Sequence, residues 1–128
     1  MNLLLDTHVA LWAITDNPKL PTSARELISL PKTTVWISGA TIWEITIKHS
    51  VGRGDMPVSG VDAMRHFVAS GYRFLAIEAE HAVAVESLPP FHHDPFDRIL
   101  IAQALTEPLR LMTHDETVAR YSDTVIRV

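Results

Sequence analysis

The sequence of 128 residues contains no cysteine, and this absence excludes disulfide bonds, thiolate nucleophiles and cysteine-ligated metal sites. A chain without cysteine suits a reducing compartment, so we expect a cytoplasmic protein. The N-terminus lacks the basic start and the long apolar stretch of a secretory signal. No apolar run approaches the roughly 20 residues that a membrane span needs, so we expect no contact with a membrane.

Internal repeats, charge blocks and low-complexity tracts are also missing. Hydrophobic residues make up 47% of the chain and charged residues 20%, which predicts one globular domain over residues 1–128. The formal net charge of −4 argues against a nucleic-acid binder, because such domains are usually basic. The objection weakens if the acidic residues gather at one site where bound cations neutralise them.

Short apolar runs alternate with longer helical patterns along the whole chain. Strands are predicted at residues 3–5, 34–38, 74–77 and 109–113, with a last edge strand at 125–128. Helices are predicted at residues 7–14, 23–30, 40–51, 58–70, 79–88, 94–105 and 115–121. Apolar strands separated by helices favour parallel pairing with helices on both faces. We therefore predict an α/β fold, a three-layer α/β/α sandwich around a central parallel sheet.

Four acidic residues fall where such a sheet would bring them to one edge. Asp6 ends the first strand and Asp115 follows the strand at 109–113, while Glu44 and Asp97 lie early in helices. Ligands bind beyond the carboxyl ends of parallel strands, and sets of oxygen ligands suit Mg²⁺ or Mn²⁺. Such ions can activate water and stabilise both oxygens of a phosphodiester displacement. The acids therefore indicate metal-assisted phosphodiester hydrolysis.

Each acid also has a purely structural interpretation. Asp6 and Asp115 precede helices and are natural N-caps, and Asp94 with Asp97 is ordinary helix-start chemistry around a proline. Glu44 can form an ion pair with a lysine one turn later on a solvent-exposed face. This last interpretation is the weakest, because the surrounding helix is apolar around most of its circumference and a carboxylate there needs a counter-charge.

At these residues the sequence resembles the PIN-domain ribonucleases, and within them the VapC-type toxins of toxin–antitoxin pairs. The matching stretches are residues 3–8 (LLLDTH), 38–45 (SGATIWEI), 94–104 (DPFDRILIAQA) and 111–115 (LMTHD). The second and third stretches are the more specific ones, and the order of all four carries the resemblance over nearly the whole chain. Around Arg53 the loop departs from the family pattern, with Gly54 and Asp55 where an apolar residue is commoner.

The resemblance implies a PIN-like α/β/α fold and an endonuclease that cleaves RNA with water, leaving a 5′-phosphate and a 3′-hydroxyl. It implies Mg²⁺ or Mn²⁺, a homodimer and a cognate antitoxin whose tail covers the site. The implied catalytic and metal-binding residues are the four acids Asp6, Glu44, Asp97 and Asp115. Thr7 and Thr113 match hydroxyl positions that orient ligands, and Asp94 is close enough to be an auxiliary ligand.

Three basic residues are candidates for contacts with RNA phosphates: Lys48, Arg53 and Arg98. Each lies near an acid in the sequence or one helical turn away, although Lys48 also suits an ion pair with Glu44 and Arg98 a structural role. The seven histidines suggest zinc, but His92 and His93 lack the i, i+4 spacing of a hydrolytic zinc site. We therefore predict no histidine ligand.

Two other classes of protein also gather acids at the edge of a parallel sheet, but the sequence departs from both. A phospho-acceptor module would carry paired acids after the first strand, where Asp6 stands alone, and a phosphatase would carry a second acid at the position of His8. A non-catalytic PIN-like binding protein would not need all four acids. A housekeeping RNA-processing nuclease without an antitoxin remains the other alternative.

Overall fold

The computed structural model describes residues 1–52 and 55–128. Its strands are β1 (Asn2–Leu5), β2 (Thr34–Ser38), β3 (Arg73–Leu75), β4 (Arg110–Thr113) and β5 (Ile126–Arg127). Its helices are α1 (Thr7–Ile14), α2 (Thr22–Ser29), α3 (Gly39–Ser50), α4 (Gly60–Ala69), α5 (Ala79–Ala84), the 3₁₀ turn η1 (Val85–Ser87), α6 (Pro95–Thr106) and α7 (Glu116–Ala119). Of these described helices, none is both long and apolar enough to cross a bilayer.

The five strands form one parallel sheet in the order β3-β2-β1-β4-β5. The chain first builds the sheet from β1 through β2 to β3, and then crosses to the other side of β1 to add β4 and β5. The order of the strands therefore reverses between β1 and β4. Ligands of open α/β sheets bind in the crevice beyond the carboxyl ends of the strands at such a point.

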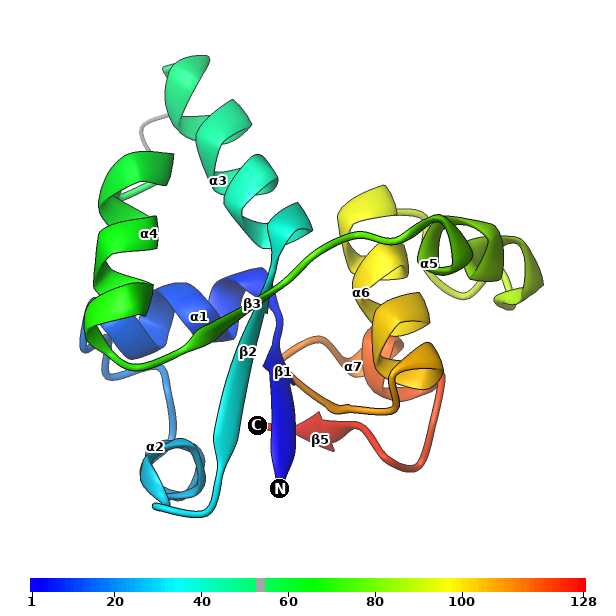
Figure 1. The fold of residues 1–128 in the computed structure, drawn as a ribbon, viewed down its shortest axis with the longest axis horizontal. Coiled ribbons are helices and arrows are strands. Elements are labelled where there is room, and N and C mark those ends of the chain that lie inside the picture. The colour runs from blue at the N-terminus through cyan, green and yellow to red at the C-terminus, as the bar shows by residue number, and fades with distance from the viewer. Residues whose placement is uncertain (53–54) are drawn as a thin grey trace.

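The first strand separates the two halves of the core because alternate side chains point to opposite faces of a sheet. Leu3 and Leu5 pack in a cluster with residues of α1, α2, α3 and α4, whereas Leu4 packs mainly with residues of α6 and α7. Figure 1 shows helices on both sides of the sheet, with α1, α2 and α4 on one side and α5, α6 and α7 on the other. The predicted three-layer α/β/α sandwich with a central parallel sheet is confirmed.

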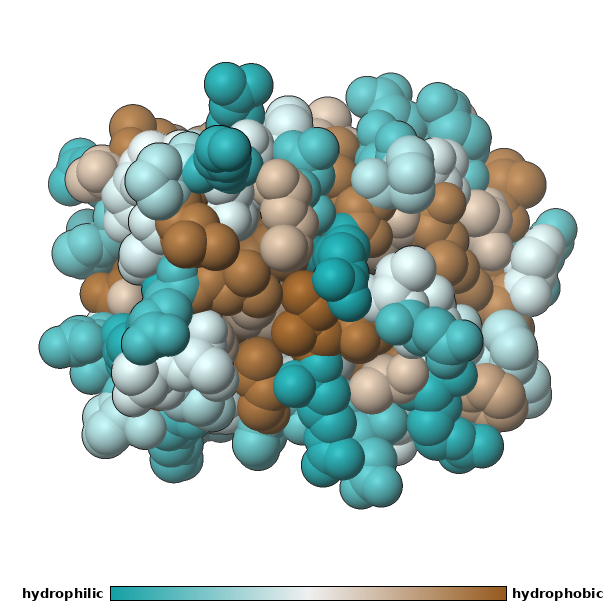
Figure 2. Space-filling model, turned by 90° about the horizontal axis from the view of Figure 1, so that it is seen from below, coloured by the Kyte–Doolittle hydropathy of each residue, from teal (hydrophilic) through white to brown (hydrophobic). Residues whose placement is uncertain are grey.

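The edge of the sheet where the strands begin and the edge where they end expose different kinds of side chain. Figure 2 looks from below at the edge where β1 begins and shows hydrophobic residues near the centre of that face, bordered by hydrophilic ones. The opposite edge, where the strands end, carries the acidic residues described below.

Several elements are shorter than predicted, and two of these differences have clear local reasons. The strand predicted at 74–77 is shorter, since β3 pairs only with β2 and Leu75 lies opposite Ser38, the last residue of β2. The helix predicted at 79–88 changes into a 3₁₀ turn after Ala84. Leu88 is extended because it precedes Pro89, and proline disfavours the helical conformation in the residue before it.

We expect replacement of Phe67 by alanine to lower the free energy of unfolding by about 3–5 kcal/mol, because it leaves a cavity in the core. Phe67 is 0% exposed and stacks on Tyr72, with 6.1 Å between the ring centroids. Its neighbour Val68 is 60% exposed, and Val68→Ala should change stability by no more than about 0.5 kcal/mol. Urea unfolding followed by circular dichroism measures both, and equal losses in the two variants would contradict this packing.

Candidate active site

Asp6 and Thr113 join the carboxyl ends of β1 and β4. One carboxylate oxygen of Asp6 accepts a hydrogen bond from the backbone N–H of Val9 (2.9 Å), and the other accepts one from the Thr113 hydroxyl (2.5 Å). Asp6 is 4% exposed. Burial raises the pKa of Asp6, and the hydrogen bonds from Thr113 and Val9 offset only part of the rise. The same Thr113 hydroxyl oxygen accepts the backbone N–H of Asp115 (3.0 Å), so one side chain fixes two acids.

Asp115 divides its two oxygens between a structural and a site role. Oδ1 caps α7 by accepting the backbone N–H groups of Thr117 (2.7 Å) and Val118 (3.1 Å). Oδ2 faces the site and lies 3.2 Å from Nε2 of His92. Burial raises the pKa of Asp115, but the hydrogen bonds from Val118, His92 and Thr117 together hold it below its usual value. The cap predicted from the sequence is present, and it leaves one oxygen free for chemistry.

Asp97 lies in the first turn of α6, and its carboxyl group lies close to other acidic side chains. Burial raises its pKa from 3.8 to about 7, and the charge of Asp94 adds to the rise. The charge of Asp6 acts in the same direction, as does that of Glu44, whereas His92 opposes them. Asp97 is therefore affected electrostatically by Asp94 in its own helix start and by Asp6 and Glu44, which are distant from it in the sequence.

Glu44 enters the site from α3 with both oxygens occupied. Oε1 accepts a hydrogen bond from the Thr7 hydroxyl (2.7 Å), and Oε2 is 2.6 Å from Nζ of Lys48. The ion pair considered for the sequence exists, but the Glu44 side chain is only 5% exposed, so it does not lie on a solvent face. The hydrogen bond with Glu44 raises the pKa of Lys48, and burial works against it. Asp94 caps α6 by accepting the backbone N–H of Phe96 (2.8 Å).

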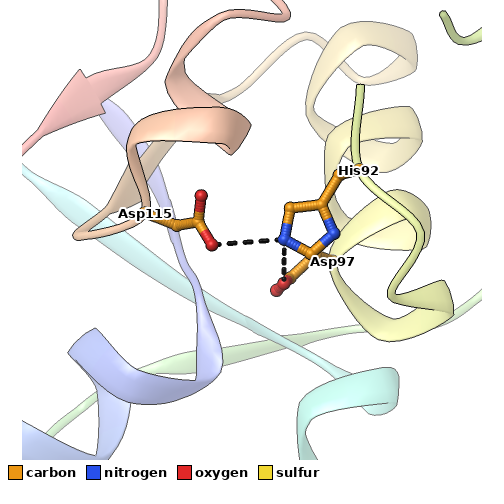
Figure 3. Close-up of side chains that lie close together, drawn as sticks. All are labelled: His92, Asp97 and Asp115. Atoms are coloured by element: carbon orange, nitrogen blue, oxygen red, sulfur yellow. Dashed lines mark hydrogen bonds and ion pairs between the residues drawn. The ribbon is translucent and has the colours of Figure 1, made fainter. Parts of the chain in front are cut away.

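His92 belongs to this site, and the sequence did not indicate it. Its Nε2 lies 3.2 Å from Asp97 Oδ2 and 3.2 Å from Asp115 Oδ2, as Figure 3 shows. Its Nδ1 faces the backbone N–H of Asp94 (3.0 Å). His92 and His93 lack the i, i+4 spacing of hydrolytic zinc sites, and this spacing was the reason for predicting no histidine ligand. A histidine two residues before a helix N-cap was the available signal, and it is weak.

Three of the four predicted acids border a cavity of about 360 Å³, which four further residues also line and which Glu44 does not line. The residues around it are Asp6, His8, Trp12, Lys19, Asp97, His114 and Asp115. The described lining of a larger cavity of about 510 Å³ includes Trp43, Ile77 and Phe96 but no acidic residue. The smaller cavity is the candidate active site because Asp6, Asp97 and Asp115 line it.

Of the three residues predicted to contact RNA, Arg98 does not contact the acids as Lys48 does. Arg98 directs its guanidinium away from the acids and toward the segment before α6, where it donates hydrogen bonds to the carbonyls of Val85, Leu88, Pro89 and His92 and to the Tyr121 hydroxyl. A structural role for this arginine, one of the two interpretations of the sequence, accounts for these bonds. Arg53 lies outside the described residues.

The donor set fits a divalent cation. Carboxylate and hydroxyl oxygens are the ligands that Mg²⁺ and Mn²⁺ prefer. Ligand atoms of His92, Asp97 and Asp115 lie within 4.8 Å of one another, and Asp6 acts on Asp97 electrostatically. Burial raises the pKa of Asp97, and the charges of Asp94, Asp6 and Glu44 add to the rise, so a cation bound beside this carboxyl would favour its charged form.

Comparison with known proteins places this arrangement in a family. A comparison with curated protein sequences finds no match. Three similar solved structures are VapBC2 from Rickettsia felis bound to a promoter DNA fragment (TM-score 0.73, 17% identity), DNA-bound VapBC from Salmonella typhimurium (0.69, 18%) and a toxin–antitoxin complex from Klebsiella pneumoniae (0.64, 18%). They cover 100%, 99% and 97% of this chain and 98%, 96% and 95% of their own.

At these identities the structures show a shared fold. The sequence model of the PIN domain covers residues 3–123, which span every acid of the site. The chain therefore belongs to the PIN domain family.

Proposed function

We propose that this chain is a metal-dependent endoribonuclease that acts in the cytoplasm as the toxin of a toxin–antitoxin pair. The observation that carries the proposal is the crowding of carboxylates around Asp97 at the point where β1 and β4 diverge. A buried cluster of like charges is unfavourable unless a cation or a proton offsets it. The cluster also answers the objection from the net charge of −4, since part of the negative charge is concentrated where cations would bind.

In this proposal Asp6, Asp97 and Asp115 hold Mg²⁺ or Mn²⁺, with Asp94 as an auxiliary ligand and Glu44 completing the negative wall. A bound ion of this kind supplies a Lewis acid and lowers the pKa of water enough for it to attack a phosphodiester at neutral pH. The contributions of the protein are orientation and burial. The Thr113 hydroxyl holds Asp6, and the Thr7 and Lys48 side chains hold Glu44.

Basic and aromatic side chains near the acids suit a single-stranded RNA. Lys48 pairs with Glu44 but keeps 40% of its side chain exposed, so it can also meet a phosphate, and Lys19 lines the cavity itself. The rings of Trp12 and His114 lie 5.2 Å apart at the cavity wall. Aromatic faces of this kind stack with bases without strong preference for sequence. Hydrolysis is proposed to leave a 5′-phosphate and a 3′-hydroxyl.

The larger, apolar cavity supports the antitoxin part of the proposal. Trp43 is 59% exposed and packs edge-on against Phe96, and each stands next to an acid of the site in the sequence. A partner bound at Trp43 and Phe96 would contact the two helices, α3 and α6, that carry Glu44 and Asp97. The structural neighbours that are described as VapBC or as a toxin–antitoxin complex agree with such a partner. A homodimer is proposed on the same resemblance.

We expect Asp97→Asn to abolish Mn²⁺-dependent cleavage of RNA, because the variant keeps the shape of the side chain and removes its charge. Loss by a factor of about 100 or more is the scale expected for a group that holds a catalytic ion. Cleavage of a labelled single-stranded RNA with Mn²⁺ and with EDTA measures it. Asp123→Asn is the matched control, since Asp123 is an exposed acid in a turn. Full activity in Asp97→Asn would refute the catalytic assignment.

The stability of the metal-free protein should depend on pH through Asp97. The pKa of this carboxyl is raised from 3.8 to about 7 in the folded protein, so only the unfolded chain has lost the proton in between. The stability that this group contributes is therefore present below about pH 4 and is lost as the pH rises toward about 7. Asp97→Asn removes the dependence.

The melting temperature of Asp97→Asn minus that of the unaltered protein should grow between about pH 5 and pH 8 in EDTA. Differential scanning fluorimetry measures this difference, in which the titration of other groups, including Asp6, largely cancels. A difference that stays constant across the range would show that Asp97 is not held in the folded protein as described.

Expression of the unaltered chain in a bacterial host should arrest growth, and expression of Asp97→Asn should not. Co-expression of the neighbouring reading frame, if it encodes the antitoxin, should restore growth. Growth curves with equal protein levels on immunoblots measure the effect. RNA cleavage in vitro without growth arrest would instead indicate a housekeeping RNA-processing nuclease.

A further inference from the structure

The acid site contains one nitrogen ligand candidate, His92, and its surroundings determine which role it can play. Nε2 of His92 is 3.2 Å from the Oδ2 atoms of both Asp97 and Asp115, close to where a cation is proposed to bind (Figure 3). We propose that His92 is a positioning residue, which donates a hydrogen bond from Nε2 to Asp115 Oδ2, holds Asp97 Oδ2 at the same distance by charge attraction, and is not itself a metal ligand. The inference rests on the proposed function, because it concerns the same ion site.

A backbone N–H determines which ring nitrogen of His92 carries the hydrogen atom. The N–H of Asp94 points at Nδ1 of His92 with 3.0 Å between the nitrogens, and an amide N–H can only donate. Nδ1 must therefore accept, which puts the hydrogen of the neutral ring on Nε2. Coordination of a metal through Nε2 would require the hydrogen on Nδ1, facing the N–H of Asp94. Histidine ligands normally donate their second N–H to an acceptor, and here that side of the ring faces a donor.

The ring has little freedom to turn away, because the chain on either side of it is anchored. The backbone N–H of His92 donates to the Tyr121 hydroxyl (2.9 Å), which in turn donates to the carbonyl of Pro89 (2.7 Å). Arg98 donates to the carbonyls of Pro89 (3.0 Å) and His92 (3.2 Å). The side chain of His92 is 17% exposed. Through this network the guanidinium of Arg98 helps to hold the segment that carries His92, although Arg98 contacts none of the acids.

A fixed donor between two carboxylates has a specific consequence. The Nε2–H attracts the Oδ2 atoms of Asp97 and Asp115 to the same point and reduces their mutual repulsion before any ion binds. A carboxylate oxygen has two lone pairs, so each can accept this hydrogen and still bind a cation. The histidine therefore prepares the ligands for the ion.

Two substitutions separate the two nitrogens of His92. The amide nitrogen of glutamine reaches the position of Nε2 and keeps a donor to the carboxylates, whereas the side chain of asparagine reaches only the position of Nδ1 and keeps an acceptor for Asp94. We expect His92→Asn to weaken Mn²⁺ binding by about 10- to 100-fold, the usual cost of losing a residue that orients a metal ligand. His92→Gln should retain most of the affinity. Isothermal titration of the full chain with Mn²⁺ and with Zn²⁺, without RNA, measures both.

Several outcomes would overturn the inference. Retention in His92→Asn with loss in His92→Gln would assign His92 to the support of Asp94 alone. Unchanged or tighter Mn²⁺ binding in both variants would remove any positioning role. Loss in both variants, with Zn²⁺ affected more than Mn²⁺, would mark His92 as a direct ligand, because imidazole favours Zn²⁺.

The same titration tests the site on which the inference rests. The Asp97→Asn variant should bind neither Mn²⁺ nor Zn²⁺. Absence of Mn²⁺ binding by the unaltered chain would contradict the proposed function itself. Normal binding by the unaltered chain, lost in Asp97→Asn, leaves the pattern of the two His92 variants to decide the inference alone. Circular dichroism confirms that each variant is folded.

Discussion

The pairing of β1 with β4 is the constraint to which the rest of the site responds. Leu5 lies opposite Met112 in their parallel register, so Asp6 and Thr113 leave the sheet side by side. Asp115 follows within two residues, and α6 adds Asp97. Carboxylates brought together away from bulk water repel one another strongly. The pKa of Asp97, raised to about 7, is the direct consequence of this crowding and of burial.

The protein offsets part of this repulsion with donors that come from every surrounding element. Hydroxyl groups of Thr7 and Thr113, the ammonium group of Lys48 and the ring of His92 each contact a carboxylate. Helix capping belongs to the same scheme, since one carboxylate can cap a helix with one oxygen and face the site with the other. The cap interpretation of Asp115 is confirmed, and the proposed site role uses its other oxygen.

The partners of the site residues divide into two groups. Glu44 is satisfied by protein donors at both oxygens, so its charge is compensated in the metal-free protein. Among the described residues, Asp97 has only the imidazole of His92 at one oxygen, and its pKa is raised. This difference in hydrogen-bond partners suggests different roles for Glu44 and Asp97 within one acid cluster. Glu44 shapes the negative wall beside Lys48, whereas Asp97 is the acid that gains most from a cation.

Local patterns in the sequence determined the order of the helices and strands, the parallel sheet and the four acids at its edge. They succeeded because periodicity, capping residues and strand ends depend on neighbours in the chain. They also offered the pairing of Glu44 with Lys48 as one interpretation, and the apolar helix around Glu44 indicated that its carboxylate would lie at least partly out of water. Only the tertiary structure decided the end of β3 and the place of His92 among the acids. The His92 segment is held by Tyr121, 29 residues away, and a contact at that separation exists only after packing brings the two segments together.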